Sequence, residues 1–253
     1  PPFPKTGPPA PPPPPPRRYF AIHTAREITA DLTLAHRFMW LQLRDDDDAS
    51  ALRPVIAWHG LRDRGYAEAR LCTWNRPGVF ARIAGAFGAA GLSVLGARLF
   101  SRADGVILDT LHVKDAATSR VPTVEAREQF EELLVRSLQG EKADFEALIR
   151  RRRLPPLYQA PPGEVVPTLI RLNNDESADA TVVDIETEDR VGLLYALATA
   201  FAALRLDIRL AKITTEKGGA FDTFYITDTE GEKITQAGRL REIERRLRAV
   251  LAK

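Results

Sequence analysis

Residues 75–80, Asn-Arg-Pro-Gly-Val-Phe, recur further along the chain as residues 189–194, Asp-Arg-Val-Gly-Leu-Leu. The correspondence continues downstream in one register, with a single residue lost in a turn. The paired positions are Phe87 with Phe201, Leu92 with Leu206, Val94 with Ile208, Ala97 with Ala211, Arg98 with Lys212, Asp109-Thr110 with Asp222-Thr223, and Asp115 with Asp228. Because extended self-similarity is the mark of a repeated structural unit, we predict two copies of one small domain.

Both copies show the same order of secondary structure. In copy one, residues 66–74 alternate between apolar and polar like a strand, and a turn at Gly78 leads into an amphipathic helix. Two strands joined at Asp104-Gly105 follow, and a second helix ends the copy. Copy two repeats this order, with Gly192 in its first turn.

One further strand in each copy would complete the ferredoxin-like βαββαβ plan, and residues 168–172 are the candidate in copy two. We therefore predict an α+β fold with two such modules, each a four-stranded antiparallel sheet with two helices on one face. The expected segments are a disordered Pro-rich spacer at 1–16, a helical connector at 17–62, module one at 63–153, a linker at 154–167 and module two at 168–253.

The composition excludes several classes of protein. A net charge of +2 over 253 residues argues against nucleic acid as the main partner, because phosphate binding needs a basic face. One cysteine, Cys72, allows no internal disulfide. The longest weakly polar stretch, residues 83–97, is too short to span a bilayer, and no signal peptide is visible. We expect a cytoplasmic protein that opens in a spacer and is part of a longer chain.

Catalytic motifs are absent from the sequence. There is no GxxxxGK[ST], no GxSxG and no HExxH. The four histidines have no metal-ligand spacing, and we interpret the aspartate run at 45–48 as a solvated helix end rather than a metal cage. We therefore expect no catalytic residue, no metal site and no cofactor within this chain.

The strand-turn-helix corner of each copy is the remaining candidate for a site. Backbone N–H groups at a helix N-terminus can hold a carboxylate, and a glycine in the turn lets a ligand approach. An ammonium group needs acidic or carbonyl acceptors, which Asp189 and Asp207 offer in copy two. Copy one has Asn75 and Ser93 at these positions, so the two sites are not expected to be equivalent. The alternative is that each glycine only closes its turn and each Asp or Asn only caps its helix.

These corners resemble the ACT domain. The pattern [DN]-R-x-G-[VL]-[FL], an amphipathic helix, then Gly-Leu-Ser-Val or Arg-Leu-Asp-Ile and a hairpin carry the resemblance, over about 66–140 and 168–253. ACT domains are ferredoxin-like regulatory modules that usually bind amino acids at domain interfaces. The resemblance thus implies amino-acid binding by Asn75, Arg76, Gly78, Val79, Phe80 and Ser93 in copy one, and by Asp189, Arg190, Gly192, Leu193, Leu194 and Asp207 in copy two.

Residues 18–23, 65–68 and 172–177 extend the resemblance to one enzyme family, the bifunctional uridylyltransferase/uridylyl-removing enzymes that modify the PII nitrogen-signal protein. In that family, a nucleotidyltransferase domain and an HD phosphohydrolase domain precede two ACT domains that sense glutamine. This chain has no Gly-Ser and no His-Asp dipeptide, so neither catalytic half is present. Val191 replaces a common Pro, and Ser93 and Asp207 replace a frequent Asn, so the ligand rests on the resemblance alone.

Two hypotheses follow. The first is a regulatory region that binds glutamine as an allosteric effector and meets PII through a full-length enzyme. The second is a free-standing ACT-repeat adaptor that acts through protein contacts, with its arginine-rich faces at 150–153 and 241–248 and its Pro-rich arm as docking surfaces. In either case the modules could form a homodimer by joining their sheets.

Overall fold

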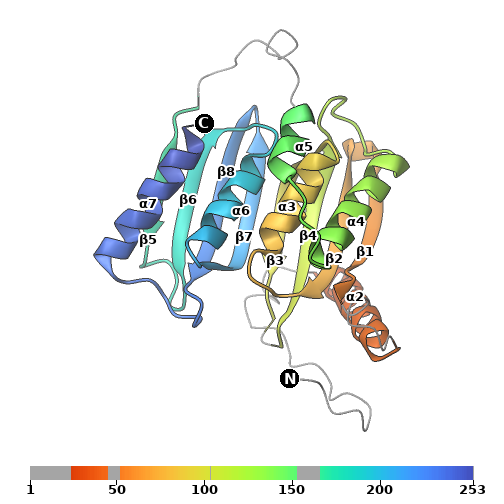
Figure 1. The fold of residues 1–253 in the computed structure, drawn as a ribbon, viewed down its shortest axis with the longest axis horizontal. Coiled ribbons are helices and arrows are strands. Elements are labelled where there is room, and N and C mark those ends of the chain that lie inside the picture. The colour runs from red at the N-terminus through yellow and green to blue at the C-terminus, as the bar shows by residue number, and fades with distance from the viewer. Residues whose placement is uncertain (1–23, 45–51, 103, 153–165, 253) are drawn as a thin grey trace.

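The computed structural model describes residues 24–44, 52–102, 104–152 and 166–252. Eight strands form one antiparallel sheet in the order β1-β2-β4-β3-β7-β8-β6-β5 (Figure 1). The strands are β1 (Val55–Leu61), β2 (Tyr66–Trp74), β3 (Leu92–Phe100), β4 (Val106–Asp115), β5 (Leu169–Asn173), β6 (Thr181–Glu188), β7 (Asp207–Glu216) and β8 (Gly219–Thr227). The helices are α2 (Ala25–Arg44), α3 (Val79–Ala89), α4 (Val124–Leu138), α5 (Phe145–Arg152), α6 (Leu193–Ala203) and α7 (Ala237–Leu251), with a short 3₁₀ turn at Arg62–Arg64.

The predicted α+β fold class is confirmed, with one difference in strand order. Each module reads ββαββα, because its fourth strand precedes the other elements instead of following them. In module one this strand is β1, which pairs with β2 through a hairpin, and in module two it is β5 beside β6. In the predicted and in the observed order, this strand lies at the edge of the sheet beside β2 or β6. The sheet is therefore the same, and only the position of the strand along the chain differs. Residues 55–61, which the sequence analysis places in the helical connector, thus belong to the sheet of module one.

The two modules share one sheet and one core. Strands β3 and β7 pair at the centre, and Arg98 faces its own repeat partner Lys212 across the ladder. On either side, Ala97 pairs with Ile213 and Leu99 pairs with Ala211, and the repeat exchanges these two pairs. A pseudo-twofold axis therefore passes through the sheet between Arg98 and Lys212, and the modules pair within the chain.

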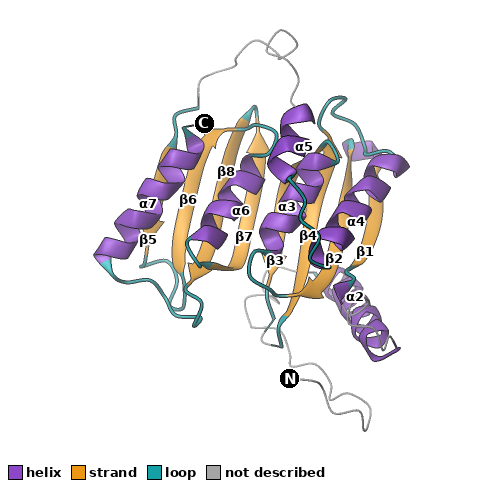
Figure 2. Cartoon of the chain, viewed as in Figure 1, coloured by secondary structure: helices purple, strands orange, loops and turns teal. Residues whose placement is uncertain are grey.

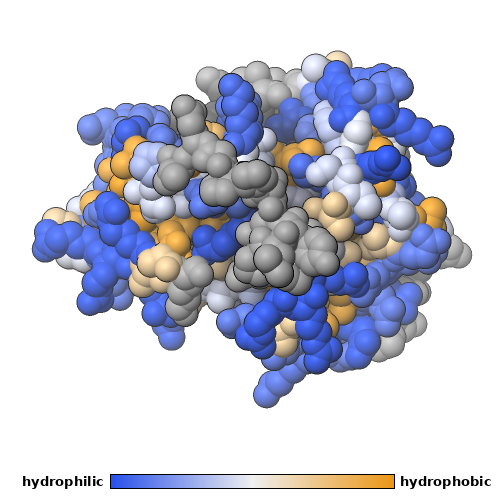
Figure 3. Space-filling view, turned by 90° about the horizontal axis from the view of Figure 1, so that it is seen from above, coloured by the Kyte–Doolittle hydropathy of each residue, from blue (hydrophilic) through white to orange (hydrophobic). Residues whose placement is uncertain are grey.

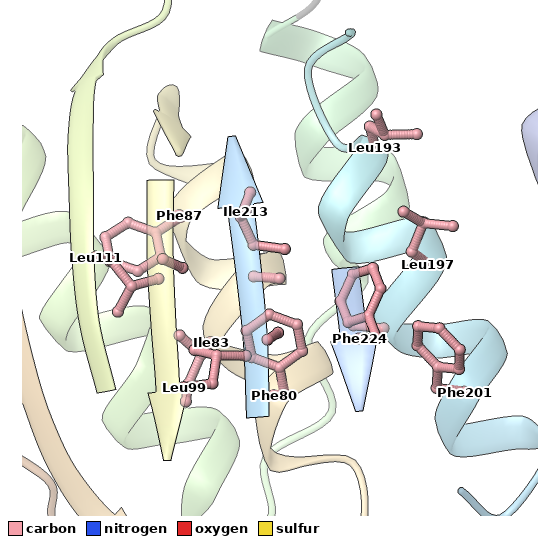
Figure 4. Packing of buried hydrophobic residues seen from close by; sticks show 14 of the residues in the cluster. Phe80, Ile83, Phe87, Leu99, Leu111, Leu193, Leu197, Phe201, Ile213 and Phe224 are labelled. Atoms are coloured by element: carbon pink, nitrogen blue, oxygen red, sulfur yellow. The ribbon is translucent and has the colours of Figure 1, made fainter. Parts of the chain in front are cut away.

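Helices α3, α4, α5, α6 and α7 cover one face of the sheet (Figure 2). Beneath them a single hydrophobic core runs through both modules (Figure 4). Among its buried residues are Ile83, Phe87, Leu111, Leu197, Phe201 and Phe224. Helix α3 packs on α6 across the pseudo-twofold axis, so burial of apolar surface joins the modules as well as stabilising each one.

Helix α2 lies on the opposite face. Consecutive residues of a strand point to opposite faces, and β4 shows this directly. Leu111 belongs to the core under α3, whereas Leu108 packs with Phe38 of α2 in a separate cluster. Thr24 and Glu27 start the helix with a capping box, in which the Glu27 N–H donates to Thr24 Oγ1 at 3.3 Å and the Thr24 N–H donates to Glu27 Oε2 at 2.7 Å.

Cys72 is buried in this second cluster, on the strand β2. Burial raises the pKa of its thiol well above the usual range, which keeps the side chain neutral. Cys72 therefore packs as a small apolar residue, and a nucleophilic role does not fit its surroundings.

The surface seen from above is mainly hydrophilic, with smaller apolar patches between charged side chains (Figure 3). In the part of the chain that the structure covers, no helix has the length and apolar character to cross a membrane. The Pro-rich segment at 1–16, the aspartate run at 45–48 and residues 154–165 of the expected linker lie outside the described residues.

Candidate functional site

The two glycine turns have the conformation that a ligand site at a helix N-terminus requires. Gly78 and Gly192 are the N-cap residues of α3 and α6, with φ of 75° and 86°. No side chain caps either helix, so Asn75 and Asp189 do not have the helix-capping role considered as an alternative. The N–H groups of the first turn of α3 and α6 carry partial positive charge without side-chain neutralisation.

A cavity of about 50 Å³ lies in front of the α3 turn, at the junction of the two modules. We call it the interface cavity. Module one contributes Asn75, Arg76, Gly78, Val79, Phe80, Ala81, Leu99, Ser101, Ile107 and Asp109, and module two contributes Ala198, Phe201, Ala202, Leu206, Asp207 and Ile208. Its volume holds a few water molecules, so a whole amino acid enters only if α3 and α6 move apart.

The structure therefore brings together six of the twelve expected site residues. Five come from copy one, Asn75, Arg76, Gly78, Val79 and Phe80, and the sixth is Asp207 from copy two. The sequence analysis groups Asp207 with Asp189, within one copy. The structure groups it with Asn75 instead, because the start of β7 faces the turn of the other module.

The other six expected residues, Ser93, Asp189, Arg190, Gly192, Leu193 and Leu194, are not among the lining of the interface cavity. In the repeat, the Gly192 turn of module two corresponds to the Gly78 turn of module one, and Ser93 corresponds to Asp207. We call this the reciprocal site. Arg190 does not turn toward a ligand there, since its Nη2 donates to the carbonyl of Val250 at 3.1 Å near the end of α7. Leu193 is buried in the shared core (Figure 4).

Sequence reasoning missed Asp109, a carboxyl group in the wall of the interface cavity. The regular β3–β4 pairing ends at Arg98 and Thr110, and the Phe100 N–H donates to Asp109 Oδ1 at 3.2 Å. Asp222, its repeat partner, accepts from the Thr214 N–H at 3.4 Å in the same way. The signal was present in the repeat, which places both aspartates at equivalent positions inside apolar strands.

Both aspartates have a pKa well above the usual value for a carboxyl group. Burial raises the pKa of Asp109 to about 8 and that of Asp222 to about 7, the latter with a further contribution from the charge of Asp189. At neutral pH Asp109 is therefore mostly protonated and presents an O–H donor as well as an acceptor to the interface cavity.

The raised pKa values predict that stability falls as pH rises. A carboxyl group free in the unfolded chain titrates near 3.8, so between about pH 4 and pH 8 the native state holds a proton that the unfolded state has lost. Protonation then favours the native state at the low end of this window, and the benefit is lost toward pH 8. We expect the melting temperature to decline from pH 5 to pH 8, and Asp109→Asn to flatten the decline. Equal slopes for the wild type and the variant would contradict this assignment.

In the described part of the chain, no group of three or more His, Cys, Asp or Glu side chains lies together in a way that could hold a metal ion. The interface cavity offers groups that can bind a small polar ligand. It has helix N–H groups for an anion, carboxyl and hydroxyl groups for a cation or amide, and apolar walls.

Comparison with known proteins agrees with this reading of the fold. Residues 176–252 match the family model described as the ACR family N-terminal ACT domain. Among curated proteins, the chain is similar to bifunctional uridylyltransferase/uridylyl-removing enzymes: that of Azospirillum brasilense is 34% identical over 194 residues, and that of Ruegeria pomeroyi is 32% identical over 194 residues. These matches cover 76% and 75% of this chain and 20% of each enzyme.

Among solved structures, aspartate kinase from Synechocystis aligns with 75% of this chain and 27% of its own chain, with a TM-score of 0.41 and 14% identity. The chain spans about a fifth of the length of the curated enzymes that it matches. Residues 176–252 therefore match an ACT domain, and about three quarters of the chain is similar to a part of the bifunctional uridylyltransferase/uridylyl-removing enzymes, as its sequence motifs predict.

Proposed function

We propose that this chain is the amino-acid-sensing region of a uridylyltransferase/uridylyl-removing enzyme, and that it binds glutamine in the interface cavity. The observation that carries the proposal is the position of this cavity. It opens at an uncapped helix N-terminus, on the junction between two ACT modules, and both modules supply polar groups to it.

Each part of an amino acid has a matching group in the cavity. The N–H groups at the start of α3 would hold the α-carboxylate, as helix N-termini hold other anions. Asp207 is half-buried and would accept from the α-ammonium group. Asp109 and Ser101 line the cavity with polar atoms for a side-chain amide, because a protonated carboxyl and a hydroxyl can each donate and accept.

Binding would change how the modules sit together. Glutamine needs more room than 50 Å³, so it would favour a state in which α3 and α6 have moved apart. The modules are joined through the pairing of β3 with β7. The ligand would therefore change the orientation of one module relative to the other. In a longer enzyme, this shift would report nitrogen status to the catalytic domains that act on PII.

A titration with glutamine tests the proposal, followed by melting temperature and by calorimetry. A ligand at 100 times its Kd stabilises by about 2.7 kcal/mol, which is a rise in melting temperature of roughly 5–10 °C for a chain of this size. Glutamate, glycine and the branched-chain amino acids serve as controls. No shift with glutamine would overturn the proposal and leave the protein-contact adaptor as the remaining hypothesis.

A matched pair of variants locates the site. Asp207→Ala removes the acceptor for the ammonium group, and we expect glutamine affinity to fall about 10–100-fold, the usual cost of losing a charged hydrogen-bond partner. Ser93→Ala changes the repeat partner of Asp207 in the reciprocal site, and we expect no change in affinity. An equal loss in both variants, or a loss only with Ser93→Ala, would place the ligand elsewhere.

A further inference from the structure

A groove of about 600 Å³ lies on the face of the sheet opposite to helices α3 and α6. We call it the sheet-face groove. Arg98 shows which face this is, because it lines the groove while its neighbours Ala97 and Leu99 belong to the core under the helices. The polar side chains of the groove that matter here are Arg98, Asp184, Lys212, Thr214, Thr223 and Glu176.

Strand register places several of these side chains in one row across the groove. Arg98 of β3 pairs with Lys212 of β7, and Lys212 pairs with Thr223 of β8. Thr223 in turn pairs with Asp184 of β6. Because neighbouring strands lie about 4.8 Å apart, Asp184 stands about 10 Å from Lys212. The row therefore has two cations at one end and a carboxylate at the other.

The cationic end lacks a full set of counter-charges. Like charges directly opposite each other on one face, with Cβ atoms about 5 Å apart, destabilise a sheet. Arg98 forms an ion pair with Glu27 of α2. Lys212 is exposed in the groove, and no residue of the described part of the chain forms an ion pair or hydrogen bond with its side chain. Thr214, two residues along β7, adds a hydroxyl donor, so this end suits an anion with several oxygens.

The acidic end has hydrogen-bond donors but no cation. Asp184 Oδ1 accepts from Thr223 Oγ1 at 2.7 Å, and Glu176 Oε1 accepts from Asn173 Nδ2 at 2.8 Å. Within the described residues, neither carboxylate has a cation at ion-pair distance. A carboxylate accepts more than one hydrogen bond, and it repels a second anion. This end therefore suits hydroxyl groups, and it confines a negative group to the Lys212 end.

We propose that the sheet-face groove binds a phosphate ester of a polyhydroxy compound, the chemistry shared by sugar phosphates and the ribose phosphate of nucleotides. The phosphate lies at Arg98 and Lys212, and the hydroxyl groups donate to Asp184 and Glu176. The volume of the groove is in the usual range for small-molecule sites. The groove has no lining residue in common with the interface cavity, so it stands whether or not that cavity binds glutamine.

Calorimetric titration with ribose 5-phosphate at fixed ionic strength tests the proposal. We expect one molecule to bind per chain, more tightly than inorganic phosphate or free ribose. Lys212→Met keeps the length of the side chain but removes its charge, and affinity for both phosphate compounds should fall about 10–100-fold. Lys142→Met is the matched control. It removes the same charge from an exposed position between α4 and α5, on the other side of the sheet, and should leave both affinities unchanged.

Asp184→Asn tests the hydroxyl end separately. It should weaken binding of ribose 5-phosphate and leave binding of inorganic phosphate unchanged, because only the sugar reaches this carboxylate. A wild-type chain that does not bind ribose 5-phosphate overturns the proposal. So does an equal loss of affinity in Lys212→Met and Lys142→Met, which would show attraction to the overall charge of the protein and no site in the groove.

Discussion

Replacing Gly192 with valine should destabilise the protein by about 2–5 kcal/mol, a fall in melting temperature of roughly 5–15 °C. Two costs add. Gly192 has φ of 86°, which strains any β-branched residue, and the new Cβ would lie 2.7 Å from Ile149 of α5. From the sequence alone, this substitution would be expected to affect a ligand site and leave the fold intact. The contact with Ile149 makes it a packing substitution instead.

A matched glycine separates the two costs. Gly231 has φ of 85°, and a Cβ placed there meets nothing within 4 Å. Gly231→Val should therefore show the backbone strain alone, and the difference between the two variants measures the clash with α5. Adding Ile149→Ala to Gly192→Val should recover part of that difference in thermal unfolding. Equal destabilisation by Gly192→Val and Gly231→Val would show that α5 does not press on the α6 turn.

Replacing Phe87 with alanine should cost about 3–5 kcal/mol, a fall in melting temperature of roughly 10 °C. Phe87 is 1% exposed, and its ring stacks on that of Phe130 with the centroids 3.8 Å apart. Trp58 of β1 meets both rings edge-on, at 6.4 Å and 5.7 Å. The truncation leaves a cavity at the point where α3, α4 and β1 meet.

The same variant tests whether the modules unfold together. The core that contains Phe87 continues into module two, so chemical denaturation should remain one transition that shifts to lower denaturant. Val124→Ala is the control, since Val124 is 60% exposed and its truncation should change stability by less than about 0.5 kcal/mol. Two separate transitions, of which only one moves, would show that the shared core does not couple the modules.

The prediction of the fold worked where the sequence repeats. The paired motifs at 75–80 and 189–194 predicted two modules. The alternation of 66–74 predicted the strand β2, and the repeat predicted its counterpart β6 in copy two. The strand β1 was missed because its seven residues, Val-Ile-Ala-Trp-His-Gly-Leu, contain Gly60 near the end and lie in what resembles a connector. Only pairing with β2, a contact between neighbours in the sheet, gives that segment its structure.

The sequence predicted the glycine turn of the candidate site but not the residues that lie opposite it, for a similar reason. Local sequence determines a glycine turn and the helix behind it, because both depend on backbone conformation over a few residues. It does not determine which residues of a distant strand face that turn.

The sequence by itself therefore determined the ACT modules, their repeat and the turns at Gly78 and Gly192. The tertiary structure decided that Asp207 joins Asn75 across the modules, that Asp109 is buried in the cavity wall, and that α5 covers the Gly192 turn. The physical reason is the pairing of β3 with β7, because it places the start of each module's β-hairpin beside the other module's helix.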